Sequence, residues 1–252
     1  VVLVEKEAQL GGFSRRLHHT IEGKDIQQYL KDLIAEVTAH EKIKVLVETR
    51  IVGFEGFKGN FATEVEVGPE KEKQNIKHGV IIVATGGKEY TPKEFLYEES
   101  DQVVTQVELS AHLEEKGAGD LNRVVMIQCV EQRSEERPYC SRVCCATAVK
   151  NALLLKERWP NTRIMVLYRD MRTYGKYEIL YEAAARKGSV FLRFADEEPP
   201  EVTVEGGQPL VKVKGQLPDG EELEIPVDLV VLVTGMVPRN NETLVEILKL
   251  PA

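Results

Sequence analysis

The pattern of apolar positions predicts an alternation of strands and helices along the chain. Short apolar runs rich in β-branched residues, typical of buried strands, occur at residues 1–7, 123–129, 163–170 and 189–194. A helix capped by Asp25 is also predicted, because apolar residues recur there at spacings of three and four. We expect this apolar stripe to be core, and it comprises Ile26, Tyr29, Leu30, Leu33, Ile34 and Val37.

Further strands are expected in the first third of the chain. The runs at residues 45–56 and 60–68 have the alternation of a β-meander, and HGVIIVATGG at residues 78–87 has the apolar content of a buried strand. The charge-rich stretches at residues 68–78 and 218–224 are predicted to be solvated hairpin turns between strands.

The order of these elements predicts an α/β fold with two Rossmann-like units and a β-meander. Glu5 ends the first strand with an acid, as the second strand of a Rossmann unit does when its carboxylate meets the adenosine ribose. That acid normally follows a G-x-G-x-x-G turn by about 20 residues, but here it is the fifth residue. We therefore expect an incomplete first unit, over residues 1–118 and 232–252, and a second unit over residues 119–231.

The cysteines are the most specific chemical feature of the chain. There are four, and they fall in one short stretch at Cys129, Cys140, Cys144 and Cys145. Cys129 is expected to end a strand, and Cys144 to open a helix that begins at about Ser141. A helix N-terminus carries roughly half a positive elementary charge and lowers thiol pKa values, so thiolates are favoured there. Positive charge nearby comes from Arg133, Arg137 and Arg142.

Four clustered thiolates suit either Zn²⁺ or an iron–sulfur cluster. The spacing C-x10-C-x3-C-C has only one pair of the kind found in structural zinc knuckles, and it departs from the C-x2-C-x2-C pattern of ferredoxins. By themselves these residues favour a [4Fe–4S] cluster and leave zinc, a thiol or disulfide redox pair and inert cysteines as alternatives.

The segment IQCVEQRSEERPYCSRVCCATAVKNALLLKE, with VLYRDMRTYGKYEILYEAAARKG after it, closely resembles the flavoprotein A subunit of heterodisulfide reductases of anaerobes. The segments VVLVEKEAQLGG, HHTIEGKDIQQYLKDLI and VLVTGMVPRNNE extend the resemblance to nearly the whole chain. It implies a truncated relative of that flavoprotein in which Cys129, Cys140, Cys144 and Cys145 ligate a [4Fe–4S] cluster beside FAD. The family continues beyond LVEILKLPA into a segment that touches the flavin.

The resemblance also implies a set of FAD contacts. Gly11 and Gly12 would let the backbone approach the cofactor, although a simple loop turn explains them as well. The end of the 78–87 strand would lie against FAD, and ordinary strand termination is again the alternative. The expected contacts are Glu5, Lys6, Gly11, Gly12, Arg15, Val52, Ala84, Thr85 and Gly86.

The second unit lacks the signature of a dinucleotide site. There is no glycine between Gly119 and Gly175, and about a dozen residues separate its first strand from its first helix. Because a pyrophosphate needs a tight glycine turn at a helix N-terminus, we expect no NAD(P)H here. The cysteines would occupy that place instead, with the loop from Asp170 to Gly175 near them.

Composition limits the possible partners and the cellular compartment of the protein. A net charge of −8 argues against nucleic-acid binding, because no basic stripe is present to neutralise phosphates. No apolar run approaches the ~20 residues that a membrane span needs. Unpaired clustered cysteines fit a reducing cytoplasm. The unpaired edge expected beside residues 1–7 invites self-association, so a homodimer is one expected state.

Two classes of function remain. The first is an oxidoreductase subunit that passes electrons between FAD and a [4Fe–4S] cluster and on to other subunits of a heterodisulfide reductase-type complex. A hydrogenase or a ferredoxin would be the electron donor, and this segment would be inactive alone. The alternative is a thiol/disulfide oxidoreductase that uses the vicinal cysteines, or a zinc-stabilised interaction module.

Overall fold

The computed structural model describes residues 1–115, 117, 119, 121–215 and 220–250. Two compact units are present, the first made of residues 1–15, 25–88 and 238–252 and the second of residues 16–24 and 89–237. Together they contain parallel and antiparallel sheets covered by helices, which confirms the predicted α/β class. In the described part, no helix combines the length and apolarity needed to cross a membrane.

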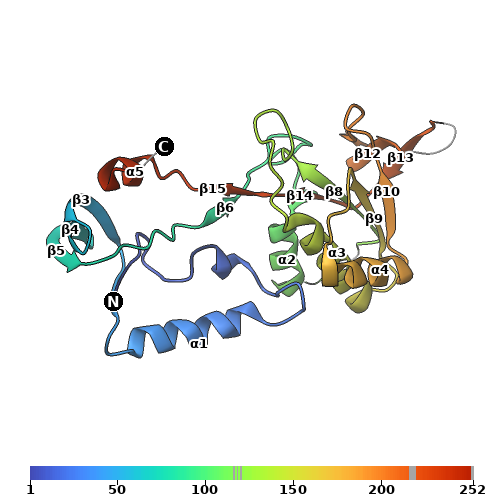
Figure 1. Cartoon of the computed structure of the whole chain (residues 1–252). Helices are drawn as coiled ribbons and strands as arrows, with labels where there is room; N and C mark the ends of the chain where they lie inside the picture. The colour runs from blue at the N-terminus through green and yellow to red at the C-terminus, as the bar shows by residue number, and fades with distance from the viewer. Residues whose placement is uncertain (116, 118, 120, 216–219, 251–252) are drawn as a thin grey trace. The chain divides into compact units, whose positions relative to one another are not determined.

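A five-stranded parallel sheet forms the centre of the second unit (Figure 1). Its strand order is β10-β9-β8-β14-β7, so β8, which leads into the cysteine region, is the middle strand. The three strands predicted in this unit are confirmed as β8 (Arg123–Val130), β9 (Arg163–Tyr168) and β10 (Val190–Arg193). The sheet also contains β7 (Val103–Thr105) and β14 (Leu229–Thr234), which were not predicted.

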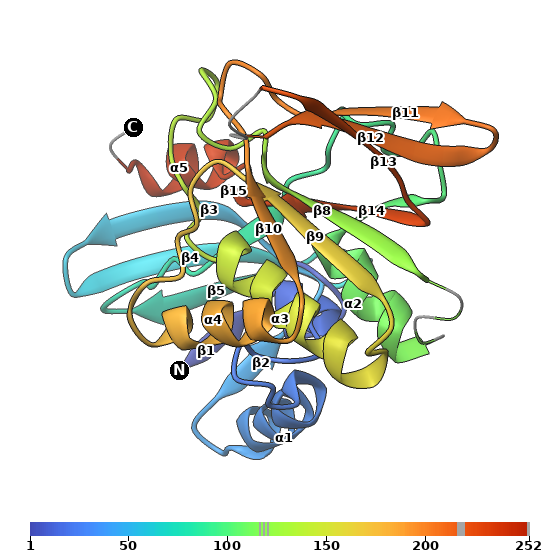
Figure 2. The ribbon, with the colours of Figure 1, turned by 90° about the vertical axis from the view of Figure 1, so that its right-hand side faces the viewer.

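Three helices cover one face of this sheet and an antiparallel sheet covers the other (Figure 2). Because side chains alternate along a strand, Val124 and Met126 of β8 face the helices, while Val125 and Ile127 face the second sheet. The helices are α2 (Gln106–Glu115), α3 (Cys144–Arg158) and α4 (Glu178–Arg186), the last preceded by the 3-10 turn η2 (Gly175–Tyr177). The second sheet consists of β11 (Glu201–Glu205), β12 (Gln208–Lys214) and β13 (Glu222–Pro226).

A buried amide joins α3 to α2. The Asn151 Nδ2 donates to the carbonyl of Gln106 at 3.2 Å, and its Oδ1 accepts from the hydroxyl of Ser110, also at 3.2 Å. Asn151 has no exposed surface, so loss of either bond would leave a polar atom unsatisfied in the core. The helix that carries Cys144 and Cys145 is therefore fixed in position as well as packed.

The first unit is built from smaller sheets. Strand β1 (Val2–Val4) pairs in parallel with β2 (Lys44–Leu46), and the helix α1 (Ile26–Ala39) lies between them in sequence. The antiparallel order β3-β4-β5 confirms the predicted meander. The remaining elements are β3 (Thr49–Phe57), β4 (Asn60–Val67), β5 (Glu72–His78), the 3-10 turn η1 (Gly12–Arg16) and α5 (Glu242–Leu248). The paired strands β6 (Gly87–Glu89) and β15 (Met236–Pro238) each include residues of both units.

The predicted core stripe on α1 is wrong. Asp25 caps the helix as expected, accepting the backbone N–H of Gln28 at 3.0 Å, but no residue of α1 is buried. Tyr29 is 66% exposed and Leu33 is 38% exposed. The parallel sheet of this unit has two strands in the described residues, which is too narrow a surface to cover the apolar face of a helix of about four turns.

The strand predicted at residues 78–87 is also wrong. Strand β5 ends at His78, and Val80 (76% exposed) and Ile82 (86% exposed) follow it without regular secondary structure. A strand needs a partner for its backbone groups, and the two-stranded sheet provides none for this run among the described residues. Apolar content alone therefore did not produce a strand.

The charge-rich turns are shorter than predicted for a related reason. Residues 68–71 do form the expected hairpin turn between β4 and β5. Residues 72–78 form β5, which pairs along its whole length with β4 and turns Gln74, Ile76 and His78 to its half-buried face. Of the second predicted turn, residues 218 and 219 lie outside the described residues, and Glu222–Pro226 forms β13. In both cases cross-strand pairing outweighs the polar composition.

Lys150 is a half-buried charge on α3, the helix that carries two of the cysteines. Its Nζ donates to the carbonyl of His19 at 3.3 Å, and burial lowers the pKa of Lys150 to about 8. Between about pH 8 and 10.5, the unfolded chain therefore holds a proton that the folded chain has lost. Stability rises with pH across a window in which the unfolded state binds more protons.

We expect the unfolding free energy of the native chain, measured relative to that of a Lys150→Met variant, to rise by about 2–3 kcal/mol from pH 8 to 10.5. Urea unfolding followed by circular dichroism at several pH values measures it. The variant is the control for every other ionisable group, because those groups are the same in both proteins. A difference that stays flat across this range would contradict the burial of the ammonium group.

Candidate cysteine site

Cys129 lies in a bulge at the carboxyl end of β8. The pairing of β8 with β14 shifts there, since Val233 aligns with Gln128 but Thr234 aligns with Val130. Cys129 is the extra residue, and its φ of 61° is in the left-handed region that glycine normally occupies. A bulge redirects the side chain that it carries, and ligands of open parallel sheets bind beyond the carboxyl ends of the strands.

The loop after β8 is anchored to the turn between β14 and β15. The Ser141 hydroxyl donates to the Gln132 Oε1 at 2.9 Å and accepts the backbone N–H of Met236, also at 2.9 Å. Gly235 permits this approach, because a Cβ at that position would lie 2.5 Å from the Gln132 Cδ and 2.5 Å from the Ser141 Oγ. Both ends of the loop over residues 131–143, called the cysteine loop below, are thereby held against the central sheet.

The backbone of this region is strained at several points. Cys129, Glu131, Arg133 and Arg142 all have φ between 48° and 62°, and none is glycine. Each such residue costs on the order of 1–3 kcal/mol, and such strain concentrates where a structure holds a particular site geometry. These positive φ values therefore support a functional role for the cysteine loop.

Cys140 is half-buried and its sulfur meets hydrogen-bond donors. The backbone N–H of Arg142 donates to the Cys140 Sγ at 3.4 Å. The guanidinium of Arg172 also lies beside this sulfur. The predicted loop from Asp170 to Gly175 is therefore confirmed as a neighbour of the cysteines.

Cys144 and Cys145 form the first turn of α3 and are each 3% exposed. The helix begins at Cys144, which confirms that Cys144 opens it, although the helical pattern was expected from about Ser141; no side chain caps it. The Cys145 Sγ lies 3.1 Å from the Gln128 Oε1 and 3.8 Å from the carbonyl oxygen of Asp170. All four cysteines are free thiols.

The four sulfur atoms influence one another's charge. A hydrogen bond with Cys145, reinforced by burial, raises the pKa of Cys144, and the negative charges of Cys129 and Cys140 act in the same direction. The same bond with Cys144 lowers the pKa of Cys145. Burial raises the pKa of Cys129. The Cys145 sulfur contacts Gln128, the residue before Cys129, and the carbonyl of Asp170 in the loop that also carries Arg172, so these thiols lie in one region of the second unit.

Arginines surround this group of thiols. The guanidinium of Arg169 lies close enough to Cys129 to oppose the rise in the pKa of that thiol, and the buried Arg169 Nε has no nitrogen or oxygen partner in the described part. Arg133 and Arg172 pair with Asp170 at 2.8 and 3.7 Å. Arg137, predicted to add positive charge near the thiols, pairs with Glu131 at 3.0 Å and lies over the ring of Tyr90.

Sequence reasoning missed several residues of this site. Gln128 reads as a single polar interruption of an apolar strand, and Ser141 and Gly235 read as ordinary loop residues. Arg172 lies in the predicted loop from Asp170 to Gly175 and Arg169 directly precedes it, but nothing in their spacing indicates contact with sulfur. Within the described residues, no group of three or more cysteine, histidine or carboxylate side chains is arranged to hold a single metal ion.

The expected flavin contacts of the first unit are only partly brought together. Glu5 follows β1, its carbonyl accepts the N–H of Thr49 at 2.9 Å, and its carboxylate accepts the N–H of Glu7 at 2.9 Å. The end of β1 therefore lies beside the start of β3, three residues before Val52, which is 38% exposed.

The other expected flavin contacts are exposed or serve local packing. A Cβ on Gly11 would lie 2.9 Å from the side chain of Leu30, so this glycine is required for packing against α1. Lys6 pairs with Glu7 at 3.6 Å, and the Arg15 guanidinium donates to the carbonyl of Leu10 at 3.4 Å. Gly12 has a φ of 49° at the start of η1, and residues 84–86 lie in the exposed segment after β5.

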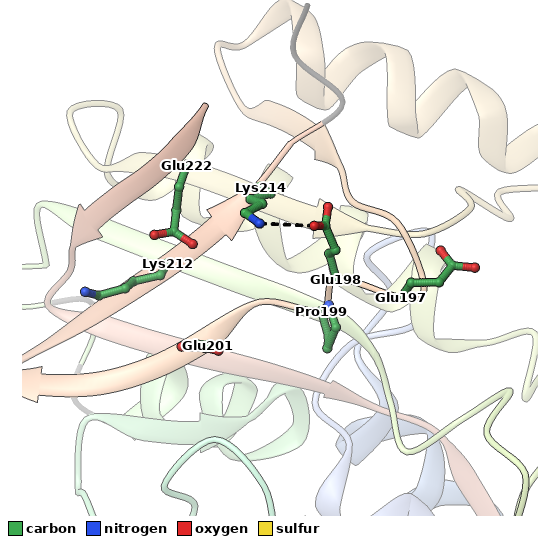
Figure 3. A pocket seen from close by; sticks show the side chains of 7 residues that line it. All are labelled: Glu197, Glu198, Pro199, Glu201, Lys212, Lys214 and Glu222. Atoms are coloured by element: carbon green, nitrogen blue, oxygen red, sulfur yellow. Dashed lines mark hydrogen bonds and ion pairs between the residues drawn. The ribbon is translucent and has the colours of Figure 1, made fainter. Parts of the chain in front are cut away.

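One hollow of the second unit is formed by charged residues of the second sheet and the segment before it (Figure 3). Lys214 pairs there with Glu198 at 3.1 Å, as Figure 3 shows, and Lys212 pairs with Glu224 at 2.9 Å. The lining residues are Glu197, Glu198, Pro199, Glu201, Lys212, Lys214 and Glu222. It contains no thiol and is a solvated, charged surface.

No protein-family model matches the chain. Among curated proteins, it is 36% identical over 204 residues to the A subunit of the H2/formate:CoB-CoM heterodisulfide,ferredoxin reductase of Methanococcus maripaludis, an alignment that covers 71% of this chain and 30% of that protein. An iron-sulfur A subunit of the CoB–CoM heterodisulfide reductase of Methanopyrus kandleri is 26% identical, with 98% of this chain and 51% of that protein covered. The chain thus spans a third to a half of these relatives.

Two solved structures share the fold. The bacillithiol disulfide reductase Bdr of Bacillus cereus superposes with a TM-score of 0.52 at 19% identity, covering 97% of this chain and 72% of that one. The reduced CoADR-RHD of Bacillus anthracis gives a TM-score of 0.50 at 14% identity, covering 99% and 41%. These similarities confirm the predicted Rossmann-type architecture.

We expect a Gly235→Ala variant to lose about 1–3 kcal/mol of unfolding free energy, because the new methyl group overlaps Gln132 and Ser141 and displaces the cysteine loop. Urea unfolding followed by circular dichroism measures the loss. Gly79→Ala is a matched control, since the nearest atom to its added Cβ is at 3.6 Å. Equal stabilities of the two variants would contradict the close contact at Gly235.

Proposed function

Because the chain belongs to the family of heterodisulfide reductase A subunits, we propose that it is an electron-transfer segment whose four cysteines hold one [4Fe–4S] cluster. The observation that carries the proposal is the gathering of all four thiols of the chain at the carboxyl end of β8. They arrive from a strained bulge, a loop and a helix N-terminus, and the ionisation of each buried thiol responds to others in the group.

The donor set has the chemistry that such a cluster requires. Iron–sulfur clusters are held by four cysteine thiolates, and their negative charge is balanced by hydrogen bonds to sulfur. Here the N–H of Arg142 meets Cys140, and the guanidinium groups of Arg169 and Arg172 lie beside Cys129 and Cys140. The orphaned Nε of Arg169, a buried donor beside a thiol, is satisfied if that sulfur is an anionic acceptor.

In this proposal the protein holds the cluster, shields it from water and sets its reduction potential. A bound cluster would accept and release one electron at a time. Burial of Cys144 and Cys145 excludes water from two of the ligands, and the arginines supply positive charge that offsets the cost of burying thiolates. No catalytic acid, base or nucleophile is needed, because cofactors carry this chemistry and the protein supplies position and electrostatics.

We assign FAD to the first unit, expected from the sequence over residues 1–118 and 232–252, and the cluster to the second unit, expected over residues 119–231. In the structure the first unit comprises residues 1–15, 25–88 and 238–252. Support comes from the flavoprotein architecture and from Glu5, which ends a parallel strand beside the meander. By the same reasoning, Lys6, Gly11, Gly12, Arg15, Val52, Ala84, Thr85 and Gly86 are the further candidates for the flavin.

The proposed partners follow from the relatives. Several are named as the A subunit of a heterodisulfide reductase, which supports other subunits as the destination of the electrons. Ferredoxin stands first in the names of two relatives and H2 stands first in the names of two others, so we propose a ferredoxin or a hydrogenase as the electron donor, in the cytoplasm. A homodimer through the edge of β1 is the remaining proposal on assembly.

A second candidate function is thiol/disulfide exchange. One observation favours it, because the hydrogen bond between Cys144 and Cys145 raises one pKa and lowers the other, as in a reactive thiol pair. This function needs two of the four cysteines, and the cluster needs all four. Zinc remains the alternative metal, and it would draw all four sulfurs to within about 2.3 Å of one ion.

We expect Cys→Ser at Cys129, Cys140, Cys144 or Cys145 to reduce bound iron or change the EPR spectrum, because a hydroxyl is a poor substitute for a soft thiolate. The measurements are iron and acid-labile sulfide per chain, and EPR after reduction under anaerobic conditions. Val143→Ser adds a hydroxyl beside Cys144 without removing a ligand and is the matched control. Full iron with an unchanged signal in the Cys144 and Cys145 variants would favour the exchange function.

We also expect no sub-millimolar binding of NADH or NADPH to the second unit. The β8–α3 connection has no glycine and its bulged, anchored loop lies where a pyrophosphate turn would be. Equilibrium titration followed by nicotinamide fluorescence tests this expectation, with an Arg172→Gln variant as the comparison. Tight binding that this variant abolishes would mean that the arginines serve a nucleotide.

A further inference from the structure

Gln128 is a buried amide whose two ends both meet sulfur. It precedes Cys129 in β8 and is 2% exposed. Its Oε1 lies 3.1 Å from the Cys145 Sγ, and its Nε2 lies 3.9 Å from the Met171 Sδ. A buried amide usually meets oxygen or nitrogen partners, because weak partners leave much of its desolvation cost uncompensated.

The position of Gln128 in the strand makes a purely packing role a poor explanation. Val124 and Met126 of the same strand face belong to the apolar core against the helices, together with Cys144. Alternation places Gln128 next in that row, where a leucine or methionine would continue the apolar face. A polar residue there costs stability unless its amide has a partner that an apolar side chain cannot replace.

We propose that Gln128 donates an amide N–H to the Cys145 sulfur of the ligated cluster and thereby raises the reduction potential of that cluster. The inference rests on the proposed function. In the metal-free chain the Cys145 thiol donates to Oε1, but a ligated sulfur has no proton and can only accept. Amide oxygen and nitrogen are nearly equal in size, so a half-turn about the Cγ–Cδ bond presents Nε2 at the same place.

The direction of the effect follows from charge. Reduction adds an electron to an already anionic cluster, and a donor that points at a ligand sulfur stabilises the more negative form. Hydrogen bonds to sulfur are among the factors that set the potentials of these clusters. Gln128 is suited to reveal the effect because it is neutral, whereas Arg169 and Arg172 also carry charge and pair with Asp196 and Asp170.

The test is an EPR-monitored redox titration of the cluster-loaded chain, with iron per chain measured on the same samples. Gln128→Leu and Gln128→Met both remove the N–H at nearly constant volume, and both should keep their iron and show a lower midpoint potential than the native chain. The second variant serves if the first fails to fold. Met126→Leu changes the same strand face without touching a hydrogen bond and should leave the potential unchanged.

Each outcome has a separate meaning. Full iron and an unchanged potential in the Gln128 variants would overturn the inference and leave the proposed function intact. A native chain that takes up no iron and sulfide would overturn the proposed function, and this inference with it. Loss of iron in both Gln128 variants, with Met126→Leu normal, would overturn the tuning role and make Gln128 a requirement for assembly.

Discussion

The one-residue slip between β8 and β14 is the constraint on which the site depends. It removes Cys129 from the ladder, holds it at a positive φ and directs it away from the regular alternation of the strand. In a straight strand, Cys129 would follow the β8 pleat toward the second sheet. The strain of the bulge, on the order of 1–3 kcal/mol, is offset by the contacts that Ser141, Gln132 and Gly235 make behind the loop.

A second balance concerns charge. Burying several thiols close together opposes their ionisation, and the raised pKa values of Cys129 and Cys144 express that cost. The helix N-terminus, the backbone N–H of Arg142 and the guanidinium groups of Arg169 and Arg172 work in the opposite direction. The resulting site is poorly suited to a neutral ligand. Its polarity suits a buried anion held by soft sulfur ligands.

The sequence predicted the second unit well and the first unit less well, for one physical reason. In the second unit, each apolar run finds neighbouring strands and covering helices within the chain, so periodicity reports burial correctly. In the first unit, α1 and residues 80–83 have the composition of core elements, yet the two strands β1 and β2 cannot cover them. Periodicity shows what a segment can bury, and only the surrounding structure decides whether it does.

Prediction of the site had a similar limit. The spacing of the cysteines identified the ligand candidates, and the segment after β9 was correctly placed beside them. The bulge, the anchoring by Ser141 and the amide of Gln128 were not foreseeable, because each depends on contacts between residues that are distant in sequence or on backbone strain that single residues do not reveal. Arg137 shows the converse. Its charge was expected to lie near the thiols, but the side chain pairs with Glu131 and lies over the ring of Tyr90.

Mössbauer spectroscopy of the chain after anaerobic reconstitution with ⁵⁷Fe and sulfide tests the central claim most directly. The account predicts about four irons per chain and a spectrum of delocalised, antiferromagnetically coupled pairs, as expected for a cluster with one iron on each of four cysteines. A single high-spin ferrous site would contradict it. Uptake of one zinc ion and no iron would also contradict it, because the four cysteines would then hold a single ion that cannot transfer electrons.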